Sequence, residues 1–376
     1  MNGPAKTLHS ALEDMLERIA RTRAMDLSGF PHYAEPRTGE WTVMPDAFWT
    51  GGFWVGELWQ AAALTGDAAT LEAARSWSQR LNPRVDSDTV FRAFLFYYGA
   101  ARGSDLHADA AARVLAVRAA YSLAKDFDPA AGLIPLGRAA EEAHTVGDDE
   151  SNIDGMIAAT LLYWASRATG DGSLADVARK HALRNAELCV QDDGSVIQSA
   201  SFDRATRQVT RRYTHKGYAD SSIWTRAQAW AMLGYSHCLA YDPGNEKLRS
   251  LALQVSDWWI AHLPADGVAF WDFTAPAESA PWKDTSGTAI GSAALLHLAP
   301  VCGDAKRAQM YNETARRSIA AMAQDYLTPT SSTDERPRGI LTAGCFDPRN
   351  SVAVSNELIW GDYFMLECLA SLTARA

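Results

Sequence analysis

The chain has 376 residues, of which 47% are hydrophobic and 21% charged, a composition typical of a folded protein with a large apolar core. Its formal net charge of -10 excludes a broad basic surface for nucleic acid, so an anionic ligand would need a local cationic pocket. The five cysteines are odd in number and include no C-x-x-C pair, so we expect buried free thiols and no thiolate metal site.

The first 24 residues carry scattered charges and lack the apolar run of a signal peptide or membrane span, which predicts a cytoplasmic protein without a membrane partner. Apolar segments with helical periodicity then recur along the whole chain, about a dozen in all. Strand-like alternation is confined to short stretches such as residues 195–202 and 267–273. The sequence therefore predicts an all-α fold.

A similar turn separates several of these helices. The four instances are Thr65-Gly66-Asp67, Thr169-Gly170-Asp171, Asp242-Pro243-Gly244-Asn245 and Cys302-Gly303-Asp304. Glycine suits the left-handed position after a helix, and Asp or Asn can cap the next helix. No Gly/Ser-rich linker interrupts the pattern, so we predict one domain, residues 1–376, folded as an (α/α)6 barrel. The longer loops, 31–48, 128–149 and 328–350, are expected at the mouth of its cavity.

Aromatic residues cluster in WTGGFWVGELW, which starts at Trp49. Core packing is the expected role of Trp59. Trp49 stands at a helix entrance beside two glycines and is the better candidate for stacking on a sugar ring.

Two acidic residues precede apolar helical runs. Asp88 could be a plain helix N-cap or a catalytic group, and the residues alone leave both open. Asp154 follows Asn152, which already suits the cap, and heads an almost wholly apolar run. Burial would raise the pKa of Asp154 and favour the protonated form that a general acid needs.

A third group lies between His215 and Trp230. Arg226 and Trp230 are four residues apart and share one face of the expected helix. An arginine on an apolar helix requires an anion, which could be an internal carboxylate or the carboxylate of a substrate.

The chain resembles glycoside hydrolase family 88, the unsaturated glucuronyl hydrolases, over nearly its whole length. The similar motifs, in order, are WTGGFWVGELW, NIDGM with LLYWASRATGD, GYADSSIWTRAQAW, GVAFWDF, WKDTSGTAIGSAALLHL and NELIWGDYFMLECL. Their shared order and spacing are far more specific than any single motif.

The resemblance implies an (α/α)6 barrel without metal or cofactor that acts on a small oligosaccharide. The expected reaction is hydration of the C4=C5 enol ether of a 4,5-unsaturated uronic acid, which releases the neighbouring sugar. Asp154 matches the family's acid/base and Asp88 its second essential aspartate, so the resemblance implies that both carboxyl groups are buried and face each other in the central cavity. The expected substrate-binding residues are Trp49, Gln198, Lys216, Trp224, Arg226 and Trp230, with Lys216 and Arg226 binding the uronate.

Three residues depart from the family pattern. Ser87 stands where a histidine is usual, Gln198 where another histidine is usual, and Lys216 where a glutamine is usual. Alternatives are therefore an unsaturated rhamnogalacturonyl hydrolase or a saturated β-glucuronidase on the same scaffold. An (α/α)6 sugar epimerase or isomerase generally relies on histidine bases, and the histidines here, such as His144 and His237, stand in no shared motif. The neighbouring sugar and the choice between monomer and homodimer are left open.

Overall fold

The computed structural model describes residues 6–140, 150–276, 278 and 281–374, and the expectations for loop residues 141–149, with His144, lie outside the described residues. The helices are α1 (Leu8–Ala24), α2 (Gly51–Thr65), α3 (Ala68–Gln79), α4 (Arg92–Phe96), α5 (Arg102–His107), α6 (Ala110–Ala124), α8 (Ile157–Thr169), α9 (Gly172–Cys189), α10 (Thr225–Tyr241), α11 (Glu246–His262), α12 (Thr285–Leu298), α13 (Ala305–Asp325) and α14 (Ile359–Ala374). A π-helical turn, η2 (Tyr97–Ala101), joins α4 to α5 without a break.

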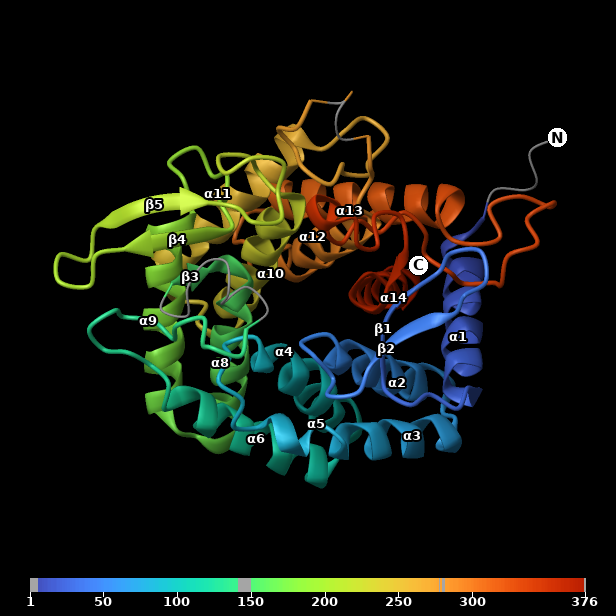
Figure 1. Cartoon of the computed structure of the whole chain (residues 1–376), viewed down its shortest axis with the longest axis horizontal. Helices are drawn as coiled ribbons and strands as arrows, with labels where there is room; N and C mark the ends of the chain where they lie inside the picture. Colours follow the sequence, from blue (N-terminus) through green and yellow to red (C-terminus); the bar gives the residue numbers. More distant parts are fainter. Residues whose placement is uncertain (1–5, 141–149, 277, 279–280, 375–376) are drawn as a thin grey trace.

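In the described part of the chain the helices form two concentric rings. The inner ring consists of α2, the continuous α4–η2–α5 segment, α8, α10, α12 and α14, each in contact with the next, and it closes where α14 meets α2. The outer helices α3, α6, α9, α11, α13 and α1 pack on successive inner helices in that order (Figure 1). This is the predicted (α/α)6 barrel, and the all-α prediction is confirmed.

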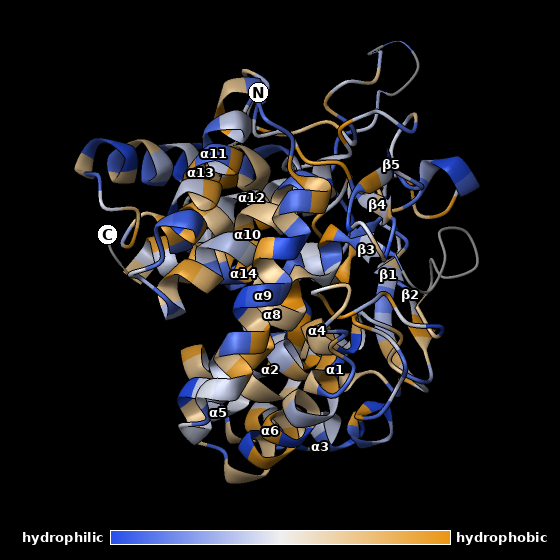
Figure 2. Cartoon of the chain, turned by 90° about the vertical axis from the view of Figure 1, so that its left-hand side faces the viewer, coloured by the Kyte–Doolittle hydropathy of each residue, from blue (hydrophilic) through white to orange (hydrophobic). Residues whose placement is uncertain are grey.

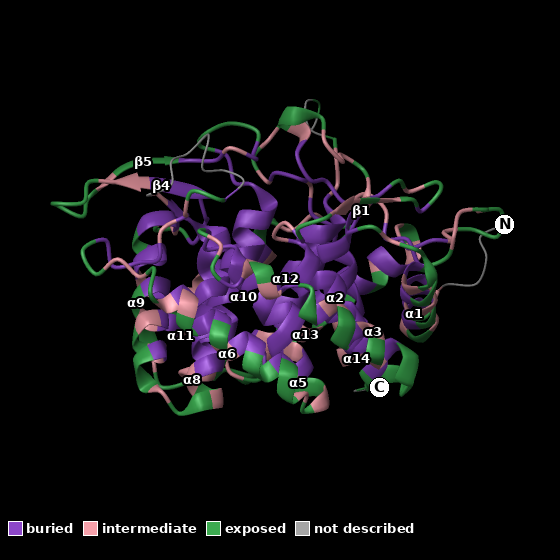
Figure 3. Ribbon diagram, turned by 60° about the horizontal axis from the view of Figure 1, so that its bottom comes forward, coloured by how far each residue is buried: buried purple, intermediate pink, exposed green. Residues whose placement is uncertain are grey.

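The difference between the rings follows from side-chain pattern. Almost every residue of α10 and α12 is buried, so these inner helices are enclosed on all sides, whereas α1 buries only one face. Figure 3 shows the same contrast, with α2 and α10 largely buried and α1 and α9 exposed along their outer sides.

The four predicted helix-to-helix turns are present. Gly66 and Gly170 adopt φ values of 69° and 79° at the ends of α2 and α8, a conformation that glycine reaches without strain. Asp67 then caps α3 by accepting hydrogen bonds from Ala69 N (3.2 Å) and Thr70 N (3.1 Å), and Asn245 caps α11. Each turn therefore ends one helix and starts the next antiparallel to it.

Two small antiparallel sheets lie at one end of the barrel. The first has strand order β2-β1-β6, formed by β1 (Phe30–Ala34), β2 (Trp41–Met44) and β6 (Glu357–Leu358); the second has order β3-β4-β5, formed by β3 (Ser151–Asn152), β4 (Ser199–Phe202) and β5 (Val209–Tyr213). Figure 2 shows β1 to β5 gathered on one side of the helices. Residues 267–273, expected to be strand-like, form only the isolated bridges Trp224↔Asp272 and Phe270↔Lys283.

The five cysteines are all described, and each is buried with a free thiol, as expected. Among the described residues no helix combines the length and the apolar character needed to cross a bilayer.

Candidate active site

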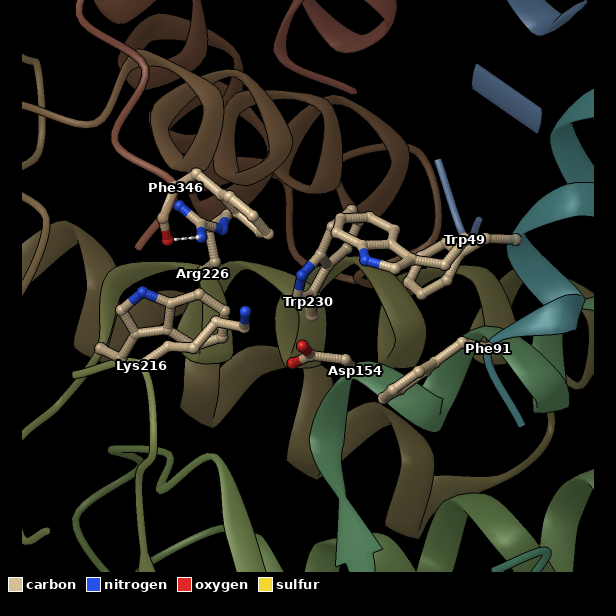
Figure 4. A pocket seen from close by; sticks show the side chains of 9 residues that line it. Trp49, Phe91, Asp154, Lys216, Arg226, Trp230 and Phe346 are labelled. Atoms are coloured by element: carbon tan, nitrogen blue, oxygen red, sulfur yellow. Dashed lines mark hydrogen bonds between the residues drawn. The ribbon is translucent and has the colours of Figure 1, made fainter. Parts of the chain in front are cut away.

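A pocket opens at the end of the barrel that carries the sheets. It contains about 300 Å³ of space not occupied by protein atoms, including space open to solvent. Its lining residues are Trp49, Phe91, Phe94, Asp154, Lys216, Trp224, Arg226, Trp230 and Phe346. Six of the eight residues expected in the site thus line one pocket, and the exceptions are Asp88 and Gln198. Figure 4 shows the Asp154 carboxyl group near the centre, between the rings of Trp49 and Phe91 on one side and the Lys216 amine on the other.

Asp154 stands on a short 3₁₀ turn, η3 (Ile153–Met156), at the entrance of α8. Asn152 caps this turn, since its Oδ1 accepts a hydrogen bond of 2.9 Å from the Asp154 backbone N–H. The cap therefore belongs to Asn152, as the sequence indicated, and the Asp154 side chain lies in the pocket with a residue exposure of only 9%.

His181, which sequence reasoning missed, anchors the same turn. The Ile134 N–H donates to its Nδ1 at 3.1 Å, so its Nε2 carries the proton donated to the Gly155 carbonyl oxygen at 2.9 Å. Burial lowers the pKa of His181 to about 4, although the hydrogen bond to Gly155 opposes the shift. The neutral ring therefore ties the residue after Asp154 to α9. In the sequence His181 is an ordinary helical position, and nothing in its motif marks it.

Asp88 does not occupy the expected position. Its side chain is 49% exposed, and Oδ2 accepts a hydrogen bond of 2.9 Å from Arg138 Nε. It does not cap α4 either, because that helix begins after Phe91 without a side-chain cap. The expectation of burial was wrong because Val90 and Phe91 take the inward positions and leave Asp88 in the loop before them. A catalytic role for Asp88 stays a prediction.

Arg226 lines the pocket, yet its guanidinium group is bound from within the protein. Nη1 lies 2.7 Å from Asp284 Oδ2 and also donates to the Cys345 carbonyl oxygen, while Nη2 donates to the Phe346 carbonyl oxygen at 2.6 Å. Arg226 and Asp284 are exposed by only 1% and 0%. Of the two anions that the sequence left open, the internal carboxylate is the one present. Its partner Asp284 lies in the WKDTSG motif and was not identified from the sequence.

Lys216 provides a cation within the pocket. Its Nζ lies 3.7 Å from Asp347 Oδ2 and 4.3 Å from the centre of the Phe346 ring, and the side chain is 5% exposed. The charge acts on a neighbour as well, since burial and then the positive Lys216 lower the pKa of His32 to about 3. Phe346 and Asp347 are further site residues that sequence reasoning missed.

The pocket wall is aromatic. Trp49 packs 5.5 Å from the ring of Phe94, and Phe94 lies 5.0 Å from Trp230, with distances measured between ring centres. Trp224 immediately precedes α10 and lies under the Arg226 guanidinium at 4.4 Å. The Trp224 Nε1–H has no hydrogen-bond partner among the described residues, so it can donate to a ligand. Trp59, in contrast, is fully buried and donates to the Gly99 carbonyl oxygen, in agreement with its expected core role.

Gln198 lies behind the pocket instead of lining it. It is fully buried, and its Oε1 accepts hydrogen bonds from Thr214 Oγ1 (2.8 Å) and from the Lys216 backbone N–H (3.3 Å). Its backbone carbonyl oxygen accepts from the Ile153 N–H at 2.8 Å. Gln198 therefore connects the segments that carry Asp154 and Lys216, and its expected contact with substrate stays a prediction.

The pocket thus combines a buried carboxyl group that can act as a general acid, the two cations Lys216 and Arg226, and an aromatic wall. Comparisons with known proteins place this site in context. No family model matches the sequence. The chain is 30% identical over 371 residues to the unsaturated glucuronyl hydrolase of Bacillus sp. (strain GL1), with 96% of each chain covered. It is 28% identical to the unsaturated chondroitin disaccharide hydrolase of Streptococcus pneumoniae (strain ATCC BAA-255 / R6), covering 94% of this chain and 90% of the relative.

Solved structures give the same result. The fold matches the crystal structure of the Bacillus sp. GL1 unsaturated glucuronyl hydrolase with a TM-score of 0.86 at 29% identity, covering 97% of both chains. It matches an asparagine variant of UGL, described with dGlcA-Glc-Rha-Glc, with a TM-score of 0.87 at 30% identity and the same coverage. The chain therefore belongs to the unsaturated glucuronyl hydrolases, the glycoside hydrolases of family 88.

Proposed function

We propose that this protein hydrolyses oligosaccharides left by polysaccharide lyases and releases the 4,5-unsaturated uronic acid from their non-reducing end. The observation that carries the proposal is the placement of Asp154, a buried carboxyl group between aromatic rings and the Lys216 cation in one pocket. The names of the relatives, which refer to unsaturated glucuronyl and unsaturated chondroitin disaccharide substrates, support the same substrate class.

In the proposed reaction, protonated Asp154 donates its proton to C4 of the C4=C5 bond, and positive charge develops at C5 and the ring oxygen. Water adds to C5 and gives its proton to the Asp154 carboxylate, which restores the acid for the next turnover. The resulting hemiketal opens at the bond between C5 and the ring oxygen, and the hemiacetal left at C1 expels the neighbouring sugar. A single acid/base therefore serves both proton transfers, unlike the two carboxylates of ordinary glycosidases.

Substrate binding is assigned to the groups that face the pocket. Lys216 attracts the uronate carboxylate, and the Trp224 Nε1–H can donate a hydrogen bond to it. Trp49 and Trp230 offer apolar faces for the flat, unsaturated ring. Arg226 is held by Asp284, so we propose that it fixes the pocket wall instead of clamping the substrate directly.

Asp88 is proposed as a supporting catalytic residue with one condition. Its side chain must exchange Arg138 for a sugar hydroxyl, which requires a rotation towards the pocket when substrate binds. We further propose that residues 1–376 act as one cytoplasmic catalytic domain, as a monomer or homodimer, without nucleic-acid or membrane partners.

The decisive experiment is turnover on a panel of lyase-generated unsaturated disaccharides, followed by the loss of ultraviolet absorbance of the conjugated double bond. The panel includes unsaturated chondroitin disaccharides and an oligosaccharide that begins with dGlcA-Glc. Saturated β-glucuronides serve as the control, because they lack the double bond that Asp154 must protonate. Activity on unsaturated members alone supports the proposal. Release of saturated glucuronate with a silent unsaturated panel would contradict it.

A further inference from the structure

A second, smaller cavity lies next to Asp154, deeper along the axis of the barrel. Its lining includes Asp154, Thr160, Trp230, Leu233 and His237. Phe94, Asp154 and Trp230 also line the candidate active site, so these three residues separate the two spaces. The cavity contains about 200 Å³ of space not occupied by protein atoms, including space open to solvent, compared with about 300 Å³ for the active-site pocket, and a water molecule fits in it.

Two polar side chains of this cavity lack hydrogen-bond partners among the described residues. Thr160 on α8 is fully buried, and its Oγ1 has none. His237 on α10 is 7% exposed, and its Nδ1 also has no hydrogen-bond partner among the described residues. Buried polar groups in folded proteins are nearly always paired, either with the protein or with an ordered water that makes two to four hydrogen bonds. A site of this size with two such groups and a carboxyl group fits that description.

On its far side, His237 packs against a second histidine that contacts a glutamate. The ring of His237 lies 4.7 Å from that of His297 at an angle of 72°, and His297 Nε2 lies 3.3 Å from Glu367 Oε2. Burial lowers the pKa of His237 well below its ordinary value, and the effect of Glu367, which opposes the shift, is smaller, so the ring is neutral. A neutral imidazole in a fixed orientation can donate or accept one hydrogen bond towards a water molecule.

We propose that this cavity binds a water molecule that links Thr160 and His237 to the Asp154 carboxyl group, which makes Thr160 and His237 positioning residues for the proton transfer. The water holds the carboxyl group in one orientation, so that the same oxygen faces C4 of the substrate in every turnover. The inference rests on the proposed function for its kinetic consequence, whereas the water site itself does not depend on it.

The test combines structure and kinetics. A high-resolution crystal structure of the unaltered protein is expected to show a water molecule within hydrogen-bond distance of both Thr160 Oγ1 and His237 Nδ1. Thr160→Val is nearly isosteric and removes the hydroxyl, so it should empty the site and lower kcat about tenfold, with KM changed less than about twofold. Thr160→Ser keeps the hydroxyl and should restore kcat. His237→Leu provides a second variant with the same expected loss.

Ser256→Ala is the matched control. The Ser256 hydroxyl is also buried without a hydrogen-bond partner among the described residues, but it lies on α11, outside this cavity. It should leave kcat unchanged. A dry cavity in the unaltered protein, or parental kcat in a folded Thr160→Val variant, would overturn the inference. If the unaltered protein hydrolyses no unsaturated uronide, the proposed function fails, and the crystallographic result still decides the water site.

Discussion

Replacement of Asp154 by asparagine separates a catalytic role from a structural one. Asparagine is nearly isosteric with aspartate, and it retains the backbone N–H that donates to Asn152 Oδ1 at 2.9 Å. The cap of the η3 turn is thus made by Asn152 and survives the substitution. We expect the free energy of unfolding to change by no more than about 1 kcal/mol, within the usual range for a substitution that removes no packing.

Activity should respond very differently. An amide has no proton to give to C4, and general acid–base catalysis typically contributes roughly 10²–10⁴-fold. The expected fall in kcat is therefore at least about a hundredfold, or about 2.7 kcal/mol of transition-state stabilisation. Initial rates on an unsaturated disaccharide and a denaturant unfolding curve measure both quantities on the same preparation. Asp171→Asn is the matched control, since Asp171 caps α9 far from the pocket and asparagine caps equally well. A folded Asp154→Asn protein with near-native kcat would refute the reasoning.

Three further predictions concern groups bound from within the protein. Arg226→Ala should lower the free energy of unfolding by about 3–5 kcal/mol, because it leaves the fully buried Asp284 carboxylate unpaired. A raised KM with an unchanged free energy of unfolding would instead identify Arg226 as a substrate clamp. Lys216→Met should raise KM for the anionic substrate at least about tenfold with a smaller effect on kcat. The control is Lys283→Met, because Lys283 lies outside the pocket but also contacts an aromatic ring, that of Phe270, and pairs with Asp266. Equal effects of the two variants on KM would argue against a uronate site at Lys216. Burial lowers the pKa of His181 to about 4, below its value of about 6.5 in the unfolded chain. The free energy of unfolding is therefore highest above pH 6.5 and falls by about 3 kcal/mol in total as the pH falls towards 4, because the unfolded chain binds the proton first. Unfolding curves at several pH values should show this loss in the parent and not in His181→Gln, and equal pH dependence of the two proteins would contradict the assignment.

Local signals predicted the barrel well. The turn at Gly66 and Asp67 combines a left-handed glycine with a capping carboxylate, and both act within a few residues of their own position. The same locality explains the success at Asp154, where Asn152 visibly takes the capping role and leaves a carboxyl group at the head of a buried helix. Such features can be predicted from sequence because the residues that determine the local conformation lie within the same short segment.

The remaining site depended on long-range contacts. The partner of Arg226 lies 58 residues away at Asp284, and only the packing of α10 against α12 selects that internal carboxylate over a ligand. The predicted burial of Asp88 was wrong for a related reason, because a loop has no periodicity to indicate which of its residues faces inward. Gln198 lies behind the pocket instead of lining it, and a sequence does not distinguish these two positions.

The closure of the inner ring by α14 has a consequence for how the chain reaches its native state. α14 follows all the other helices of the barrel along the chain, so it leaves the ribosome after them, and it fills the space between α12 and α2 while α1 packs on its outer side. Until it emerges, the apolar flanks of α2 and α12 have no partner, and the nascent protein is an open arc with two unprotected edges. Exposed apolar surface of this kind promotes aggregation during synthesis. Truncation within α14 should therefore reduce the yield of native protein far more than truncation of an equally long surface segment.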